Sequence, residues 1–292
     1  ERGRATSLTN ISMMVGGAIT AIIAAALIGK FGWRAVFYSL FVPGILLAIL
    51  FWIMVKDSPA KDKKLSAEEL SEINSDDVAV ESAEKVKVVD ILKYPLVWQL
   101  YIVYFMSALV SFGLNNWLSV YVVDYLKGTL MQFGVAALFV SFGGLIGQLV
   151  GGFIADKSRA TQSIQMCVSW ILAAVFLYFG ISTNSLQTAV IFFAAESFFF
   201  FLAVSAFFAK MSVSLPRKAM GLGAGIIQTS GYVAGAISPI LIGFIVQSTG
   251  GSYKTAFIAM CGLLLVAGIL ALTLKKSGFT EKQPAEPDLD MS

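Results

Sequence analysis

The chain has 292 residues, of which 57% are hydrophobic and only 13% are charged, and this balance excludes an ordinary soluble domain. Its net charge of +3 is too small and too dispersed to indicate nucleic-acid binding. The absence of histidine excludes histidine-based metal sites and Ser-His-Asp or Cys-His catalysis. No GxxxxGK[ST] segment occurs, which excludes a built-in P-loop ATPase.

Eight apolar segments are long enough to cross a membrane, which takes about 20 helical residues. The sequence therefore predicts an all-α, polytopic membrane protein. The third segment is long for one span, so we expect its end to emerge at the membrane surface or the helix to tilt. The predicted spans are 6–29, 34–55, 94–123, 130–154, 162–181, 186–211, 219–246 and 254–274.

The long polar stretch 56–93 contains seven lysines and ten acidic residues. We interpret it as a solvated cytoplasmic linker between two helical bundles. Residues 1–55 are then the last two helices of an N-terminal bundle, and 94–276 form a C-terminal bundle of six helices. Residues 277–292 are predicted to be a disordered cytoplasmic tail.

Lysine and arginine in short loops indicate the orientation, because they accumulate on the cytoplasmic side. With eight spans, the two ends of the chain share a side. That side holds nine basic residues in short loops and next to helix ends, whereas the opposite side holds four: Lys30, Arg34, Lys127 and Lys254. We therefore expect both ends of the chain in the cytoplasm and the protein in the cell (plasma or inner) membrane.

The first and seventh spans are similar to each other. Residues 4–29 and 218–243 share seven identities at a constant offset, and GWRAVF at 32–37 resembles SYKTAF at 252–257. We interpret this as a duplicated helix pair, which is typical of transporters built from two similar halves. Four spans precede the second copy and none precedes the first, so we expect a twelve-helix protein whose first four helices are absent here.

Glu196 is the one charged residue that falls deep inside a predicted span. It lies about ten residues into its helix, roughly 15 Å deep at 1.5 Å per residue. A carboxylate at the bilayer centre costs about 2.5 kcal/mol or more, so such residues face a cavity or the bundle interior. We predict that Glu196 takes up and releases a coupling proton or contacts the substrate. The alternative is a permanently protonated carboxyl group that hydrogen-bonds a neighbouring helix.

Two other spans carry polar side chains. Those of the third span recur at three- and four-residue spacing and so share one helix face, and a second cluster lies within the seventh span. A polar stripe in a membrane helix lines a wet path or bonds other helices. The candidate substrate-binding residues are Tyr104, Ser111, Asn115, Asn116, Gln228 and Thr229.

Short motifs along the chain resemble the major facilitator superfamily. GFIADK at 152–157 is similar to the family's G-x-x-x-D-[RK] signature between helices 8 and 9, although the usual following residues are reduced to Ser158 and Arg159. GWRAVF resembles the start of helix 6 in that family. By this resemblance the eight spans are helices 5–12 of a twelve-helix fold, and the third span is one of the helices that line the substrate path.

Two further motifs resemble the anion:cation symporters and organophosphate antiporters of that superfamily. WLSVY at 117–121 is similar to their W-x-P-x-Y, with serine in place of proline, and SPILIG at 238–243 is similar to their helix 11. The resemblance implies a symporter of a small organic anion, such as a sugar acid, coupled to H+ or another cation by alternating access. Organophosphate or phosphate antiport is the alternative.

The resemblance also implies a gating role for Gly152, Asp156 and Lys157 on the short cytoplasmic turn. The family places this turn near the start of helix 5, here Thr6-Ser7, where helix amides stabilise a carboxylate by about 0.3–1 kcal/mol. We expect Asp156 to lie close to those amides in an outward-open state.

Functions of other classes are less well supported by the sequence. A membrane sensor or scaffold would be favoured by a large soluble domain, and 56–93 is too short for one. An intramembrane enzyme would need clustered Asp, Glu, Ser or Cys side chains, so we expect no enzymatic activity. The predicted partners are a small-molecule substrate, a coupling cation and the lipid bilayer, without cofactor, metal or nucleic acid, and the protein is expected to be a monomer.

Overall fold

The computed structural model describes residues 2–54, 88–157, 161–215 and 219–274, with side chains from residue 16 onward except residue 18. Within these residues eight long helices match the eight predicted spans, and no strand occurs. The all-α class is therefore confirmed. The long helices are α1 (Arg2–Phe31), α2 (Trp33–Met54), α5 (Pro95–Val120), α6 (Leu130–Lys157), α7 (Gln162–Ser182), α8 (Leu186–Ser214), α9 (Met220–Ser248) and α10 (Tyr253–Leu272).

Seven helices in the described part of the chain are long and apolar enough to cross a membrane, namely α2 and α5 to α10. In α1, the apolar segment among the described side chains is Ile19–Phe31. Three predicted spans were too short by three or four residues at one end, since α1 begins at Arg2, α6 extends to Lys157 and α8 extends to Ser214. A short helix, α4 (Val88–Leu92), precedes α5, and α5 continues without a break as the π-helix η2 (Tyr121–Tyr125).

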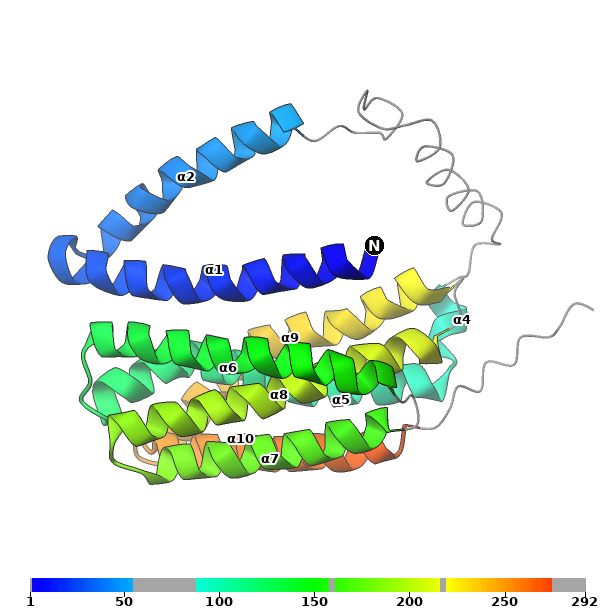
Figure 1. Ribbon diagram of the computed structural model, residues 1–292. Helices are drawn as coiled ribbons and strands as arrows, with labels where there is room; N and C mark the ends of the chain where they lie inside the picture. Colours follow the sequence, from blue (N-terminus) through cyan, green and yellow to red (C-terminus); the bar gives the residue numbers. More distant parts are fainter. Residues whose placement is uncertain (1, 55–87, 158–160, 216–218, 275–292) are drawn as a thin grey trace, which may run out of the picture.

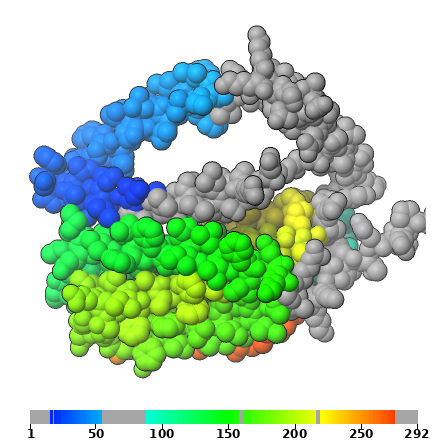
Figure 2. Space-filling model, in the orientation of Figure 1, coloured from blue at the N-terminus to red at the C-terminus, as the bar shows by residue number. Residues whose placement is uncertain are grey.

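The helices run alternately between two ends of the molecule (Figure 1). We call one the Asp156 end, where α6 and α8 finish, and the other the Gly32 end, where α1 turns into α2. Helices α5 to α10 pack as a bundle, and α1 lies along α6. No residue of α2 is buried, and Figure 2 shows α2 standing apart from the bundle.

Three glycines bring α6 into backbone contact with α8. Gly143, Gly147 and Gly151 recur every four residues and so share one face of the helix. A side chain at these positions would collide with the α8 backbone, so only glycine permits this approach. The α8 residues whose backbone atoms lie there are Ala194, Phe198 and Leu202.

Helices α5 and α9 meet through a second close contact. Gly231 of α9 lies against the ring of Tyr104, where a Cβ atom would be 2.7 Å from a ring carbon. Nearby, the hydroxyl group of Ser238 donates a hydrogen bond of 2.6 Å to the backbone carbonyl of Leu109. This bond joins a residue of α9 directly to the main chain of α5.

Replacing Ser238 by alanine is expected to lower the free energy of unfolding by about 0.6 kcal/mol, and by no more than about 1.7, as for other bonds between membrane helices. Ser238 is 1% exposed, so water does not readily replace the lost donor. Thermal unfolding of the purified protein measures this loss of stability. Ser248→Ala is the control, because that exposed hydroxyl bonds only within its own helix, to Ile245. Equal melting temperatures for the two variants would contradict the interhelical bond.

The first helix pair, α1 and α2, and the last pair, α9 and α10, are joined by similar turns. Helices α1 and α2 join at Gly32, whose φ is 79°, and α9 and α10 join through Gly250 and Gly251, with φ of 69° and 92°. Glycine is the residue that readily adopts such positive φ angles. This shared turn supports the duplicated helix pair that the sequence predicts.

Candidate functional site

Glu196 lies in the middle of α8 and is almost completely buried. Its side chain is 4% exposed, and its Oε1 atom has no hydrogen-bond partner among the described residues. Buried polar atoms without a protein partner are normally satisfied by ordered water. The carboxyl group is therefore placed where water or a proton would complete its interactions.

A small cavity of about 60 Å³ lies beside Glu196, between α5, α6 and α8. Ser111 and Asn115 of α5 line it together with Glu196. The structure thus brings Glu196 to the same cavity as two predicted site residues of another span. The other lining residues are Leu114, Leu118, Val140, Ser197, Phe200 and Phe201.

The polar side chains of this cavity differ in exposure. Glu196 is buried, Ser111 is half-buried and Asn115 is exposed. The Asn115 side-chain amide donates to the backbone carbonyl of Ser111 at 2.9 Å, which leaves its own carbonyl oxygen as an acceptor. Polar groups therefore extend from the open surface of α5 to the buried carboxyl group.

The other polar residues of α5 do not reach this cavity. Tyr104 is half-buried and stacks on Phe207, with ring centroids 5.1 Å apart. Ser107 is 1% exposed and donates to the carbonyl of Tyr104 at 2.9 Å. Asn116 is exposed and donates to the carbonyl of Phe112 at 2.7 Å. Tyr104 and Ser107 are therefore packed inside the bundle, whereas Asn116 is exposed.

Gln228 and Thr229 are exposed on α9. The hydroxyl group of Thr229 donates back to the carbonyl of Gly225 at 2.9 Å, within the same helix. Gln228 precedes Gly231 by three residues, so it lies on the side of α9 that contacts Tyr104. Thr229 lies farther round the helix.

The predicted substrate-binding residues occupy two levels. At about 1.5 Å per residue, Asn115 lies about 15 Å from the end of η2, and Glu196 lies about 15 Å from the start of α8. Both of these helix ends are at the Gly32 end. By the same measure, Tyr104 and Gln228 lie about 30 Å from that end. The structure therefore does not gather all candidates into one place, and it separates the two groups by about 15 Å along the bundle.

Gly152, Asp156 and Lys157 occupy the last turns of α6. Asp156 and Lys157 are exposed, and a Cβ atom at Gly152 would have no neighbour within 4 Å. The position that has no room for a side chain is instead Gly151, which lies against the backbone of Leu202. The gating role of Gly152, Asp156 and Lys157 stays a prediction.

Helix α1 contacts α6 near the Gly32 end. A Cβ atom at Gly134 would lie 3.3 Å from the carbonyl oxygen of Ala21 and from the side chain of Ala25. Toward the Asp156 end the two helices diverge (Figure 1). The close contact between α1 and α6 that the described side chains show is therefore the one near the Gly32 end.

The expected contact between Asp156 and the start of α1 stays a prediction, but the helix starts earlier than the sequence predicted. Since α1 begins at Arg2, Thr6 and Ser7 lie about one turn inside the helix, where backbone amides bond within the helix. They are therefore not the free helix-start amides that the prediction assumed. The side chains of Thr6 and Ser7 lie outside the described residues, and the predicted contact concerns an outward-open state.

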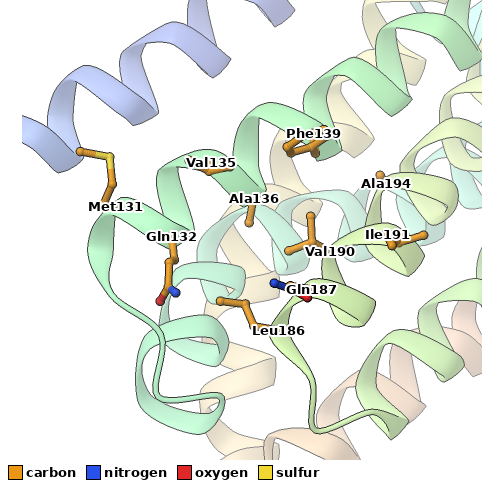
Figure 3. A pocket seen from close by; sticks show the side chains of 10 residues that line it. All are labelled: Met131, Gln132, Val135, Ala136, Phe139, Leu186, Gln187, Val190, Ile191 and Ala194. Carbon is orange, nitrogen blue, oxygen red and sulfur yellow. The ribbon is translucent and has the colours of Figure 1, made fainter.

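A second cavity, of about 640 Å³, lies between α6 and α8 near the Gly32 end (Figure 3). Its lining is apolar except for the amides of Gln132 and Gln187, and the Gln132 oxygen accepts a bond from the backbone amide of Thr129 at 2.8 Å. None of the predicted site residues lines it. An apolar lining favours hydrocarbon over a hydrophilic solute.

The sequence did not predict the burial of Lys210 or Gln165. Lys210 is 9% exposed and lies one residue before the predicted end of its span, and α8 continues to Ser214. Gln165 of α7 donates to the carbonyl groups of Gly151 at 2.9 Å and of Leu202 at 3.2 Å, and so ties α6, α7 and α8 together. A glutamine in an otherwise apolar span was the signal for this role.

Comparison with known proteins identifies the family. The model of the Major Facilitator Superfamily matches residues 1–239. A "Probable sulfoacetate transporter" of Cupriavidus necator is 26% identical over 297 residues, covering 98% of this chain and 67% of that protein. A "Probable galactarate/D-glucarate transporter" of Bacillus subtilis is also 26% identical, covering 99% of this chain and 67% of the relative. The chain thus spans about two thirds of their length.

The fold agrees with this match. The crystal structure of a bacterial homologue of the human lysosomal transporter Spinster, in an inward-facing and unoccupied conformation, superposes with a TM-score of 0.65 at 15% identity. The superposition covers 94% of this chain and 70% of the other. Family and relatives are transporters rather than enzymes. With its membrane-spanning helices and a family match over most of its length, the chain is a multi-pass membrane protein that belongs to the major facilitator superfamily.

Proposed function

We propose that this chain is part of a secondary transporter that carries a small organic anion, such as a sugar acid, together with a proton by alternating access. The observation that carries the proposal is Glu196, a buried carboxyl group in the middle of the bundle beside a cavity with polar walls. A carboxyl group at such depth is costly to keep, and it is typical of proton-transfer sites in transporters.

The chemistry of the exposed polar residues supports an anionic solute. Asn115, Asn116 and Gln228 are exposed amides within membrane-spanning helices, where polar groups face a wet path rather than lipid. Amide N–H groups donate hydrogen bonds to carboxylate and hydroxyl oxygens. The two relatives are named for organic anions, sulfoacetate and galactarate or D-glucarate, which supports the same class of solute.

Alternating access is supported by the contact between α1 and α6. These helices meet at Gly134 and diverge toward the Asp156 end. We place both chain ends in the cytoplasm and the protein in the cell membrane, so the Asp156 end faces the cytoplasm. The divergence at that end supports transport through a state that opens toward the cytoplasm.

The surroundings of Glu196 suit a group that gains and loses one proton. The side chains from α5 and α6 that line its cavity carry no charge. The titratable group that interacts with Glu196 from α10 is the thiol of Cys261. Because no lining cation holds the carboxylate in its charged form, burial favours the neutral acid, and access to water decides when the proton leaves.

The proposal predicts proton-driven uptake of organic anions by the native full-length protein in membrane vesicles. With an inside-alkaline gradient of one pH unit, worth about 1.4 kcal/mol, a sugar acid should accumulate up to about tenfold per coupled proton. Radiolabelled galactarate and sulfoacetate measure this, and a protonophore should abolish it. Uptake that requires preloaded phosphate would indicate an antiporter instead. No uptake of any anion would indicate a sensor or scaffold.

A further inference from the structure

We propose that the cavity between α5, α6 and α8 is a water-binding site that conducts protons between the transport path and Glu196, and that the organic solute does not enter it. This inference rests on the proposed function, because it assigns a route to the proton of that transporter. It divides the predicted site in two, with Ser111 beside the proton route and the solute held elsewhere on the path.

The size of the cavity selects water over an organic solute. A water molecule needs about 10–15 Å³ of such space, so 60 Å³ holds a few molecules. Pockets for organic ligands measure about 300–1,000 Å³. A sugar acid therefore does not fit beside Glu196 in this state, whereas a short chain of water molecules does.

The lining supplies the bonds that such water requires. A buried water molecule usually makes about three hydrogen bonds to polar groups that lack other partners. Glu196 has an Oε1 atom without a partner among the described residues, and the polar residues Ser111, Asn115 and Ser197 also line the cavity. Because Asn115 is exposed and Glu196 is buried, these groups join the open surface of α5 to the carboxyl group.

The proton step balances without another reactant. A hydronium ion formed in the path passes one proton along the cavity water to Oε1 of the Glu196 carboxylate. One O–H bond breaks on the last water and one forms on the carboxyl group, which leaves water and a neutral acid. Release reverses these steps. The apolar walls at Leu118 and Phe200 confine the proton to this route.

The first test reports on water in the cavity and needs no transport. In the full-length protein, the infrared C=O band that disappears in Glu196→Gln should shift when H₂O is replaced by D₂O, because water reaches the acid. Val140→Phe fills the cavity from an apolar wall without removing a polar group, and should slow this exchange at least tenfold. Val135→Phe makes the same change on α6 outside the cavity, and should leave it unchanged.

The second test separates proton conduction from solute binding. Val140→Phe should slow proton-driven uptake at least tenfold, whereas counterflow exchange at equal pH should keep its KM within twofold. Val140→Met, with its melting temperature measured, serves if the phenylalanine variant fails to fold. A raised counterflow KM would show that solute enters the cavity, and would overturn the proposal.

The outcomes distinguish the two proposals. If the wild-type protein accumulates anions without any proton dependence, the proposed coupling fails, whatever the infrared band shows. If coupling depends on Glu196 but the band does not shift in D₂O, or if Val140→Phe leaves both the band and the uptake unchanged, the water site alone is wrong.

Discussion

Glu196→Gln is expected to abolish proton-driven accumulation of the solute while solute exchange across the membrane persists. Glutamine has nearly the shape of a protonated glutamate but neither gains nor loses a proton at this position. The bundle can therefore keep alternating, as if its carboxyl group were permanently neutral. Accumulation driven by one pH unit should fall by about tenfold, to the level without a gradient. Uptake at two pH values and counterflow measure the two activities.

Two variants serve as controls for this result. Asp124→Asn changes an exposed carboxylate on η2 to an amide, so it tests the effect of lost charge outside the bundle interior. It should retain full accumulation. Glu196→Asp keeps a carboxyl group beside the cavity and should retain proton-dependent uptake at a reduced rate. Accumulation by Glu196→Gln equal to that of the wild type would exclude Glu196 as the coupling site.

Gly147→Ala is expected to have the largest effect on folding. Its Cβ atom would meet the Cα atom and the carbonyl group of Phe198, which belong to the backbone and cannot turn aside. The two helices must then separate, and overpacking of this kind typically costs about 1–3 kcal/mol. We expect a lower melting temperature and a lower yield of folded protein, as measured by thermal unfolding and size-exclusion chromatography in detergent.

Gly262→Ala is the matched control for this variant. A Cβ atom at Gly262 of α10 would have no neighbour within 4 Å. Alanine is favoured over glycine in a helix interior by about 1 kcal/mol, so this change should leave stability unchanged or raise it. If Gly147→Ala were as stable as Gly262→Ala, the backbone contact between α6 and α8 would be wrong.

The sequence was sufficient to predict the helices and the depth of Glu196. Runs of about 20 apolar residues require membrane-spanning helices, and the helical rise converts a residue number into a depth. The residues of one span that share a face also follow from spacing alone. Spacing alone predicts that Ser111 and Asn115 share one face of their helix, and in the structure both line one cavity with Glu196.

The partners of each helix face did not follow from spacing. Tyr104 lies on the same face of α5 as Ser111, but its ring packs between Gly231 of α9 and Phe207 of α8, outside the cavity beside Glu196. A stripe along one helix therefore meets different neighbours at different levels. Periodicity within one segment carries no information about which other segment lies opposite, so the split of the candidate site could not be predicted.

The contacts of single residues near helix ends could not be predicted from the sequence either. The signature motif pointed to Gly152, whereas the steric contact lies at Gly151, one residue away and facing α8. Lys210 lies one residue before the predicted end of its span, 211, where a lysine is expected at the membrane surface. The structure buries its side chain instead, and this burial depends on tertiary contacts that local composition does not reveal.

Proton movement that accompanies solute entry tests the central claim most directly. In de-energised vesicles that hold the full-length protein, addition of the transported anion should raise the external pH, as each solute carries a proton inward. The Glu196→Gln variant should take up solute by exchange without this pH change. Solute uptake by the wild type without any change in external pH, or an equal pH change in the variant, would contradict proton coupling through Glu196.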